Sequence, residues 1–358
     1  MAPVRIGIVG SGAIAQVHHL PNLMALREEF SVEVLCDLSP ALVQSIAERF
    51  HVPRYVTDYR ELLAADIDAV LICCVDPKTE VARAAFDAGL HVFIEKPFCY
   101  TLDDADAIIE AANAAGRVGQ LGYMKVFDPA FELVEQQVQS MEDIRYIQVN
   151  HLHTNNSHHL RHFDLERATD LPETHAKSTQ LLRQAGLRAN FGDLPAEAER
   201  AFYIVAGSLV HDLYGLRHLF GPPASVLSTE IWRDGYGITT VLEYAMGARC
   251  VATWIELPDI LEFKETLEIN SANRRVSLSY PTGFARGLLS EVRIDGVDDD
   301  GRAFSKELAV EWESPFSREL QHFHQCITAG TPCRTSIESG RHEVSLTIDI
   351  INRYLERG

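Results

Sequence analysis

An apolar run near the start of the chain, residues 4–9, leads directly into a glycine-containing turn. The turn reads Gly10-Ser11-Gly12-Ala13-Ile14-Ala15, which is the G-x-G-x-x-A form of the dinucleotide-binding fingerprint. In this pattern the first glycine permits a tight turn, the second lets a pyrophosphate approach the backbone, and the small third residue lets helix pack on strand. The segment therefore predicts a βαβ unit that holds a diphosphate at the N-terminus of its helix.

The rest of the first third of the chain alternates short apolar runs with helical patterns. We expect further strands at 31–35, 68–75, 91–94 and 118–124, and helices at 14–28, 40–50, 79–88 and 102–115. Strands separated by helices of this length predict a parallel sheet that is covered on both faces. This is the doubly wound, or Rossmann, class of α/β fold.

The pattern changes after about residue 125. Residues 155–195 are polar and irregular in period, which suggests an insertion or a lid, and 196–220 reads as a long helix. Several strand-like runs with turn signals between them, among them Asp-Gly pairs, follow up to about residue 308 and indicate a mostly antiparallel sheet. At about 150 residues per domain, a chain of 358 residues predicts two domains. We assign a Rossmann domain to 1–125 and an α+β domain with a large, mostly antiparallel open sheet to 126–358, with helices at 129–140, 317–329 and 337–357.

Charge and cysteine content exclude several classes of protein. The chain carries 51 acidic and 32 basic residues, a net charge of −19, which argues against nucleic acid and against an anionic membrane as partners. No apolar stretch approaches the roughly 20 residues that span a bilayer. The seven cysteines form no C-x-x-C pair, so we expect neither a disulfide framework nor a zinc ribbon. A reducing cytoplasm fits this pattern.

Asp37 stands at the end of the second predicted strand, 25 residues after Gly12. A carboxylate at this place accepts hydrogen bonds from both hydroxyls of a ribose. No lysine or arginine follows it immediately, so a 2′-phosphate would find no obvious partner there. The sequence therefore favours NAD over NADP.

Only six of the 32 basic residues are lysines, and one of them stands in Glu95-Lys96-Pro97 directly after a predicted parallel strand. The carboxyl ends of such strands form the edge at which open α/β sheets bind ligands. There Lys96 could stabilise an alkoxide, or relay a proton if desolvation lowers its pKa. The alternative is a solvated surface lysine.

Taken together, these segments resemble the glucose–fructose oxidoreductase, inositol dehydrogenase and rhizopine-catabolism (Gfo/Idh/MocA) oxidoreductases. Further matching segments are His18 after the glycine turn, Gly122-Tyr123-Met124-Lys125 before Asp128-Pro129, His211-Asp212-Leu213 before Leu216-Arg217, and the helical region 323–355. The resemblance is strongest over 1–130 and loose over 155–200. It implies a Rossmann domain, and a second domain whose open sheet carries the substrate and often an oligomer interface. It also implies oxidation or reduction of a sugar or cyclitol hydroxyl with a nicotinamide.

The resemblance also implies roles for individual residues. Lys96 matches the catalytic lysine of the E-K-P motif, and His211 matches the catalytic histidine of a D-x-x-x-H pattern. The carboxylate of that pattern falls on Gly207, which is a departure from the family. Either Lys96 and His211 work without it, or Asp212 or a residue of the insertion substitutes. Lys125 would line the substrate site.

A cluster of histidines distinguishes the start of the second domain. His151 and His153 face the same way on a strand, and three more follow in the sequence: His158, His159 and His162. A metal site, a polar wall facing the substrate and a solvated lid are the alternatives. We assign no metal ligands, and we count His151 and His153 as substrate contacts with Lys125 and Asp212.

These observations lead to one hypothesis and two alternatives. The hypothesis is an NAD-dependent dehydrogenase of a sugar, glycoside or cyclitol. The cofactor contacts would come from Gly10, Gly12, Ala13, Ile14, Ala15, Asp37, Glu95 and Lys96. The first alternative is redox-neutral glycoside cleavage or epimerisation through transient oxidation of a sugar carbon, and the second is a non-catalytic nucleotide-binding protein. A homo-oligomer, dimer or tetramer, through the C-terminal sheet is expected.

Overall fold

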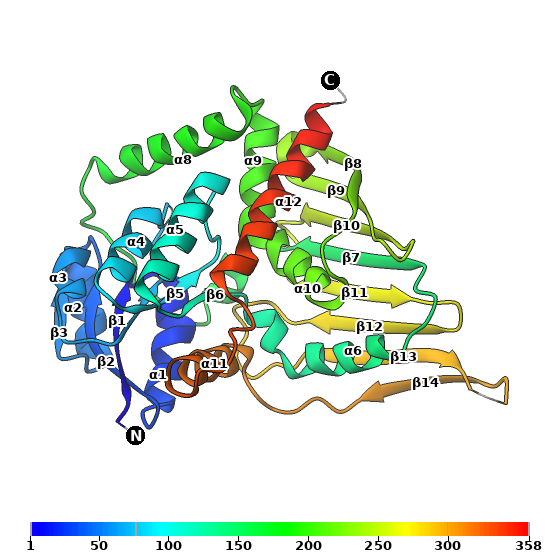
Figure 1. Ribbon diagram of the computed structural model, residues 1–358, viewed down its shortest axis with the longest axis horizontal. Helices are drawn as coiled ribbons and strands as arrows, with labels where there is room; N and C mark the ends of the chain where they lie inside the picture. The colour runs from blue at the N-terminus through cyan, green and yellow to red at the C-terminus, as the bar shows by residue number, and fades with distance from the viewer. Residues whose placement is uncertain (1, 76, 299, 357–358) are drawn as a thin grey trace. The chain divides into compact units, whose positions relative to one another are not determined.

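The computed structural model describes residues 2–75, 77–298 and 300–356, and its strands form two separate sheets (Figure 1). The chain divides into two compact units, which are described separately. The first unit comprises Met1–Tyr123, Phe163–Gly192 and Phe316–Val344. The second comprises Met124–His162, Asp193–Pro315 and Ser345–Gly358. The domain ranges 1–125 and 126–358 and the roles given to them stay predictions.

The sheet of the first unit has six strands in the order β3-β2-β1-β4-β5-β6. All of its pairings are parallel. The strands are β1 (Val4–Val9), β2 (Phe30–Cys36), β3 (Arg54–Val56), β4 (Ala69–Ile72), β5 (His91–Glu95) and β6 (Gly119–Gly122). Because the strand order reverses between β1 and β4, a ligand crevice is expected at their carboxyl ends. The predicted Rossmann fold is confirmed.

Helices of the first unit begin and end where the sequence provides caps. Ser39 precedes α2 and accepts the N–H of Leu42 on its hydroxyl, and Thr101 caps α5 in the same way. Gly116 (φ 60°) ends α5 in the left-handed conformation. The helical elements are a π-helical turn η1 (Ala15–His19), α1 (Leu20–Ala25), α2 (Pro40–Arg49), α3 (Tyr59–Leu63), α4 (Thr79–Asp87), α5 (Leu102–Ala115), α8 (His175–Phe191) and α11 (Pro315–Ala329).

Some of these elements differ from the expectation. The segment 14–28 begins with a π turn and ends as α1 at Ala25. Residues 155–195, in which no helical period of apolar residues was apparent, contain α8. This helix has 17 residues, of which Leu187 is the buried one. A helix that buries so little carries no apolar stripe, so its period is invisible in the sequence.

The sheet of the second unit has eight strands in the order β14-β13-β12-β11-β7-β10-β9-β8 (Figure 1). Only β7 and β10 pair in parallel; the other neighbours are antiparallel, which confirms the expected mostly antiparallel sheet. The strands are β7 (Tyr146–His153), β8 (Ser225–Trp232), β9 (Gly237–Glu243), β10 (Arg249–Glu256), β11 (Lys264–Asn270), β12 (Arg274–Tyr280), β13 (Glu291–Val297) and β14 (Ala303–Leu308).

Burial alternates along these strands because one face of the sheet is covered and the other is open. In β10, for example, Cys250, Ala252 and Trp254 are buried, and the residues between them are half-buried. The helical elements are η2 (Met124–Phe127), α6 (Pro129–Gln139), α7 (Ser157–Leu160), α9 (Ala196–Ile204), η3 (Val205–Leu209), α10 (Val210–Phe220) and η4 (Arg233–Gly235), and α12 (Ile337–Leu355) has residues in both units. Arg357, where the last helix was predicted to end, lies outside the described residues.

The long helix expected over 196–220 is interrupted by a π-helical turn, η3. A π turn adds a residue to the helix and often marks a functional position. The α-helical i, i+4 spacing assumed between Gly207 and His211 is therefore modified at this point. Across the described part of the chain, no helix combines the length and the apolar character that crossing a bilayer would require.

Candidate functional site

The glycine turn has the geometry that a dinucleotide requires. Gly10 has φ of 101°, and a Cβ there would lie 2.5 Å from the backbone nitrogen of Cys74, so no other residue fits. A Cβ added at Gly12 would meet no atom within 4 Å, which leaves open space beside the backbone. Ala15 is fully buried at the start of η1. The turn can thus admit a diphosphate to its backbone and to the following helical turn.

Asp37 lies beside this turn because it directly follows β2. Its carboxylate accepts the backbone N–H of Ser11 at 2.8 Å and that of Ser39 at 3.0 Å. A second carboxylate, Asp170, accepts the N–H of Ala41 at 3.0 Å and the hydroxyl of Ser39. These hydrogen bonds, that from Ser39 above all, hold the pKa of Asp170 below its usual range. Two carboxylates therefore stand where β2 leads into α2.

Residues 164–170, which we call the strap, contact the glycine turn within the first unit. The side-chain amide of Gln16 donates to the carbonyl of Ser11 at 2.7 Å and to that of Glu166 at 3.0 Å. The Gln16 oxygen accepts the N–H of Glu166 at 3.0 Å. Asp170 makes the contacts with Ser39 and Ala41 at the other end of the strap. Part of the segment expected to be an insertion or lid thus borders the candidate cofactor site.

The Glu-Lys-Pro segment ends β5, and its glutamate is held from two sides. Glu95 is 4% exposed; its Oε1 accepts the Nε2–H of His19 at 2.7 Å and its Oε2 accepts the N–H of Lys96 at 3.1 Å. Burial alone would raise the pKa of Glu95. The His19 hydrogen bond and the charges of Lys96 and Lys78 outweigh burial and hold this pKa below its ordinary value.

Glu319 on α11 is a member of this group that the sequence analysis missed. It is fully buried, and neither carboxylate oxygen has a hydrogen-bond partner among the described residues. Ligand atoms of His19, Glu95 and Glu319 lie within 4.8 Å of one another, and we call these residues the first cluster. Burial, and secondarily the charge of Glu95, raises the pKa of Glu319 well above its ordinary value. In the sequence, the signal that could have revealed the burial of Glu319 was its position between the apolar residues of an amphipathic helix.

In the second unit, Lys125 is held in a buried ion pair. It is 6% exposed and pairs with Glu265 on β11, which is 2% exposed. The ammonium nitrogen lies 4.7 Å from the ring centroid of Tyr280, a distance typical of a cation–π contact. Glu265 was not singled out in the sequence, where it is one of many acidic residues on strands.

His151 connects this pair to α10. Its Nδ1–H donates to Asp212 at 3.0 Å and lies 3.5 Å from Glu265. On the other side of the ring, Nε2 lies 3.3 Å from the hydroxyl of Ser208, which accepts the indole N–H of Trp254 at 2.9 Å. A chain of hydrogen bonds therefore runs from β10 through η3 and β7 to α10. We call Lys125, His151, Asp212 and Glu265 the second cluster.

The remaining predicted residues are placed as follows. His153 lies 3.4 Å from His151 and stacks on Trp254. His211 lies on α10, and a Cβ added at Gly207 would meet no described atom within 4 Å, so the backbone has room for a side chain at this position. Lys96 belongs to the first unit and His211 to the second. Their catalytic partnership stays a prediction.

The histidines further along the chain have other hydrogen-bond partners. His158 contacts the carbonyl of Pro258 at 3.0 Å, and His159 contacts the hydroxyl of Thr154 at 2.9 Å. Among the described residues, His151 is the member of the histidine cluster 151–162 that belongs to a group able to hold a metal ion. The other two members of that group are Asp212 and Glu265.

Comparisons with known proteins agree with this geometry. The sequence model of an oxidoreductase family with an NAD-binding Rossmann fold matches residues 4–123. An inositol 2-dehydrogenase/D-chiro-inositol 3-dehydrogenase of Shouchella clausii is 37% identical over 138 residues, which cover 37% of this chain and 39% of that protein. The chain thus matches about two fifths of the length of the curated relatives.

Two solved structures resemble the chain over nearly its full length. A UDP-N-acetylglucosamine 3-dehydrogenase of Acidithiobacillus ferrooxidans has a TM-score of 0.72 and 18% identity, with 99% of this chain and 98% of that chain covered. A 3-ketoreductase of Actinomadura kijaniata, in complex with NADP and TDP-benzene, has a TM-score of 0.73 and 18% identity, with 98% of each chain covered. At this identity the likeness establishes the fold.

Proposed function

Because the chain belongs to the Gfo/Idh/MocA oxidoreductase family through residues 4–123, we propose that it is an NAD-dependent dehydrogenase of a sugar, glycoside or cyclitol hydroxyl. One observation carries this proposal. The glycine turn, Asp37 and the Glu95-Lys96 pair follow strands β1, β2 and β5 of one parallel sheet, so they share its carboxyl edge. When bound there, NAD supplies the acceptor for a hydride from the substrate carbon.

The residues around Asp37 support NAD over NADP. The carboxylates of Asp37 and Asp170 both accept hydrogen bonds from Ser39, the first from its backbone N–H and the second from its hydroxyl. A 2′-phosphate placed at the end of β2 would face both negative charges, whereas ribose hydroxyls can donate to them. A local helical N-terminus at the glycine turn compensates for the acidic character of the chain as a whole.

We assign the proton chemistry to Lys96 and His211. Lys96 stabilises the alkoxide that forms as the hydroxyl loses its proton, and His211 accepts that proton. Glu95 fixes the backbone of Lys96 through the hydrogen bond to its N–H. Lys125, His151, His153 and Asp212 are assigned to hold substrate hydroxyls. Gly207 offers no carboxylate, so in this proposal His211 either works without one, or Asp212 or a residue of the insertion substitutes for it.

A screen of sugars, cyclitols and glycosides tests the proposal. NADH absorbance and product mass are measured together for each compound. We expect Lys96→Ala to lower turnover of the active compound by about 10²–10⁴-fold, while the dissociation constant for NAD changes far less. Lys306→Ala, which removes an exposed lysine, is the control. Unchanged turnover in Lys96→Ala would overturn the assignment.

The strap favours a second candidate function. Its hydrogen bonds to Gln16 and Ser39 border the cofactor site, which suits a cofactor that stays bound through the whole cycle. Such a protein cleaves or epimerises a glycoside by taking a hydride from a sugar carbon and returning it in the same turnover. Product release without net NADH, by a protein that purifies with NAD, would select this function over net oxidation.

We also propose that the protein is a cytoplasmic homo-oligomer, a dimer or tetramer. The seven free cysteines suit a reducing compartment. On the open face of β10, Val251 and Ile255 are only half-buried, and this face is available to a second copy of the chain. Light scattering after size exclusion measures the state, and a monomer at micromolar concentration would contradict it.

A further inference from the structure

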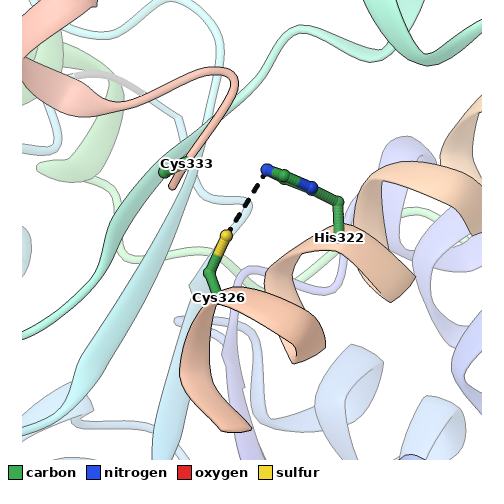
Figure 2. Close-up of side chains that lie close together, drawn as sticks. All are labelled: His322, Cys326 and Cys333. Atoms are coloured by element: carbon green, nitrogen blue, oxygen red, sulfur yellow. Dashed lines mark hydrogen bonds between the residues drawn. The ribbon is translucent and has the colours of Figure 1, made fainter. Parts of the chain in front are cut away.

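Two cysteines and a histidine converge at the end of α11, outside every group assigned to the dehydrogenase reaction. His322 and Cys326 are one helical turn apart on the same face of α11, and Cys333 lies in the segment that leads to α12 (Figure 2). One ligand atom from each residue lies within 4.8 Å of the other two. The separation of Cys326 Sγ from His322 Nε2 is 3.4 Å.

We propose that His322, Cys326 and Cys333 bind one thiophilic divalent cation, with zinc as the prime candidate. Zinc binds sulfur at about 2.3 Å and imidazole nitrogen at about 2.0–2.1 Å in tetrahedral geometry. Those bond lengths place a sulfur and a nitrogen ligand about 3.5 Å apart. The separation between Cys326 and His322 agrees with this edge, so the helix already spaces two of the ligands correctly.

The donor atoms are in a state that suits a cation. Nε2 of His322 accepts the N–H of Arg334 at 2.9 Å, so Nε2 carries its lone pair and the ring proton is on Nδ1. The cation would replace that hydrogen bond. Binding would release the thiol protons of Cys326 and Cys333 to solvent, and the two thiolates would then neutralise the divalent charge.

The exposure of the three side chains shows that solvent can reach this group. Cys326 is 4% exposed, whereas His322 and Cys333 are half-buried, so a cation can enter from solvent and keep water as its fourth ligand. Cys333 also contacts the side-chain oxygen of Gln120 on β6, with a distance of 3.7 Å. The amide nitrogen of Gln120 donates to the carbonyl of Glu319 on α11 at 2.9 Å, which fixes its orientation.

The position of the site predicts its role. The segment after α11 is joined to β6 by the Gln120–Ser336 bridge and by hydrogen bonds between Leu121 and Thr335. β6 is the edge strand of the sheet. A cation held by α11 and Cys333 would fasten this segment against that edge, so we assign the site to the stability of the first unit.

The test uses the full chain, reduced and freed of metal with a chelator that is then removed. We expect one Zn²⁺ per chain by elemental analysis after reconstitution, and a melting temperature that rises with Zn²⁺ and falls again with chelator. Co²⁺ in its place should give the thiolate charge-transfer and tetrahedral ligand-field bands. These readouts need no variant, so they remain decisive if a substitution impairs folding.

Variants assign the ligands. Loss of an outer-shell partner already lowers metal affinity by about 10–100-fold, so Cys326→Ala, Cys333→Ala and His322→Gln should each exceed about 100-fold. Matched controls are Cys250→Ala, a cysteine of the second unit, and His324→Gln, a half-buried histidine on α11; both should bind as the parent does.

Three outcomes would overturn the proposal. The first is a reconstituted chain without stoichiometric metal, and the second is undiminished affinity in Cys326→Ala and Cys333→Ala. The third is a purified chain whose mass is two hydrogens short because Cys326 and Cys333 are joined, since a disulfide would then explain their proximity. Peptide mapping before reduction distinguishes that case.

Discussion

Each unit buries a group of ionisable side chains, and the two groups differ in how their carboxylates are satisfied. In the second cluster, Glu265 pairs with Lys125, and Asp212 accepts a hydrogen bond from His151. In the first cluster, Glu95 accepts hydrogen bonds from His19 and from the Lys96 backbone, but neither oxygen of the fully buried Glu319 has a partner among the described residues.

This difference determines the charge state that each cluster can hold. A buried carboxylate is stable as an anion only when a cation or several donors compensate for lost hydration; otherwise it keeps its proton. The second cluster is therefore an ionic network that depends on Lys125. The first cluster contains a neutral acid beside an ionised one. Removal of the cation should therefore destabilise the second cluster, whereas replacement of Glu319 by a side chain that cannot ionise should stabilise the first cluster as pH rises.

The largest effect is expected for Lys125→Met. The substitution keeps most of the length of the side chain but leaves Glu265 buried without its cation, which typically destabilises a protein by about 3–5 kcal/mol. Urea unfolding monitored by fluorescence measures this loss. Lys264→Met, at an exposed position of β11 next to Glu265, is the matched control and should change stability little. Equal effects of the two substitutions would show that burial of the ion pair is not what matters.

An intermediate effect is expected for Asp212→Asn. Its carboxylate accepts the Nδ1–H of His151, and hydrogen bonds to charged groups contribute about 1.5–3 kcal/mol. The amide is nearly isosteric, so a loss of this size in urea unfolding would come from the charge and the hydrogen bond. A variant as stable as the parent would mean that the hydrogen bond between Asp212 and His151 does not hold the second cluster together, and the contrast between the clusters would fail.

The same comparison shows what the sequence could predict. Contiguous motifs, whose spacing is fixed by a strand and the turn after it, allowed prediction of the parallel sheet and the glycine turn. The same motifs allowed Asp37 and Lys96 to be placed at the ends of strands. The antiparallel sheet was accessible through its turns. In each case the information lies in one strand and the turn that follows it, or in the spacing within a single βαβ unit.

The partners within the clusters could not be predicted from the sequence, and the reason is physical. Glu265 and Glu319 reach their clusters from β11 and α11, which are far from Lys125 and Glu95 in sequence. An acidic residue on a strand or on an amphipathic helix is usually solvated, and only packing reveals that it is buried. Likewise, Cys326 and Cys333 lack the C-x-x-C spacing of familiar metal sites, and His322 completes the group only because α11 places it one turn away.

The smallest effect, and the one of opposite sign, is expected for Glu319→Gln. Burial raises the pKa of Glu319 in the folded protein above its unfolded value, so its contribution to stability is fully present below the unfolded pKa and is lost as pH rises toward the folded one. Glutamine has no proton to lose, so the variant escapes this loss. Relative to the parent it should gain stability above pH 5, by at most about 1.4 kcal/mol per pH unit. Urea unfolding of both proteins at pH 5, 6 and 7 measures the difference; a difference that stays constant or shrinks with pH would place a charged carboxylate at Glu319 and remove the contrast between the clusters.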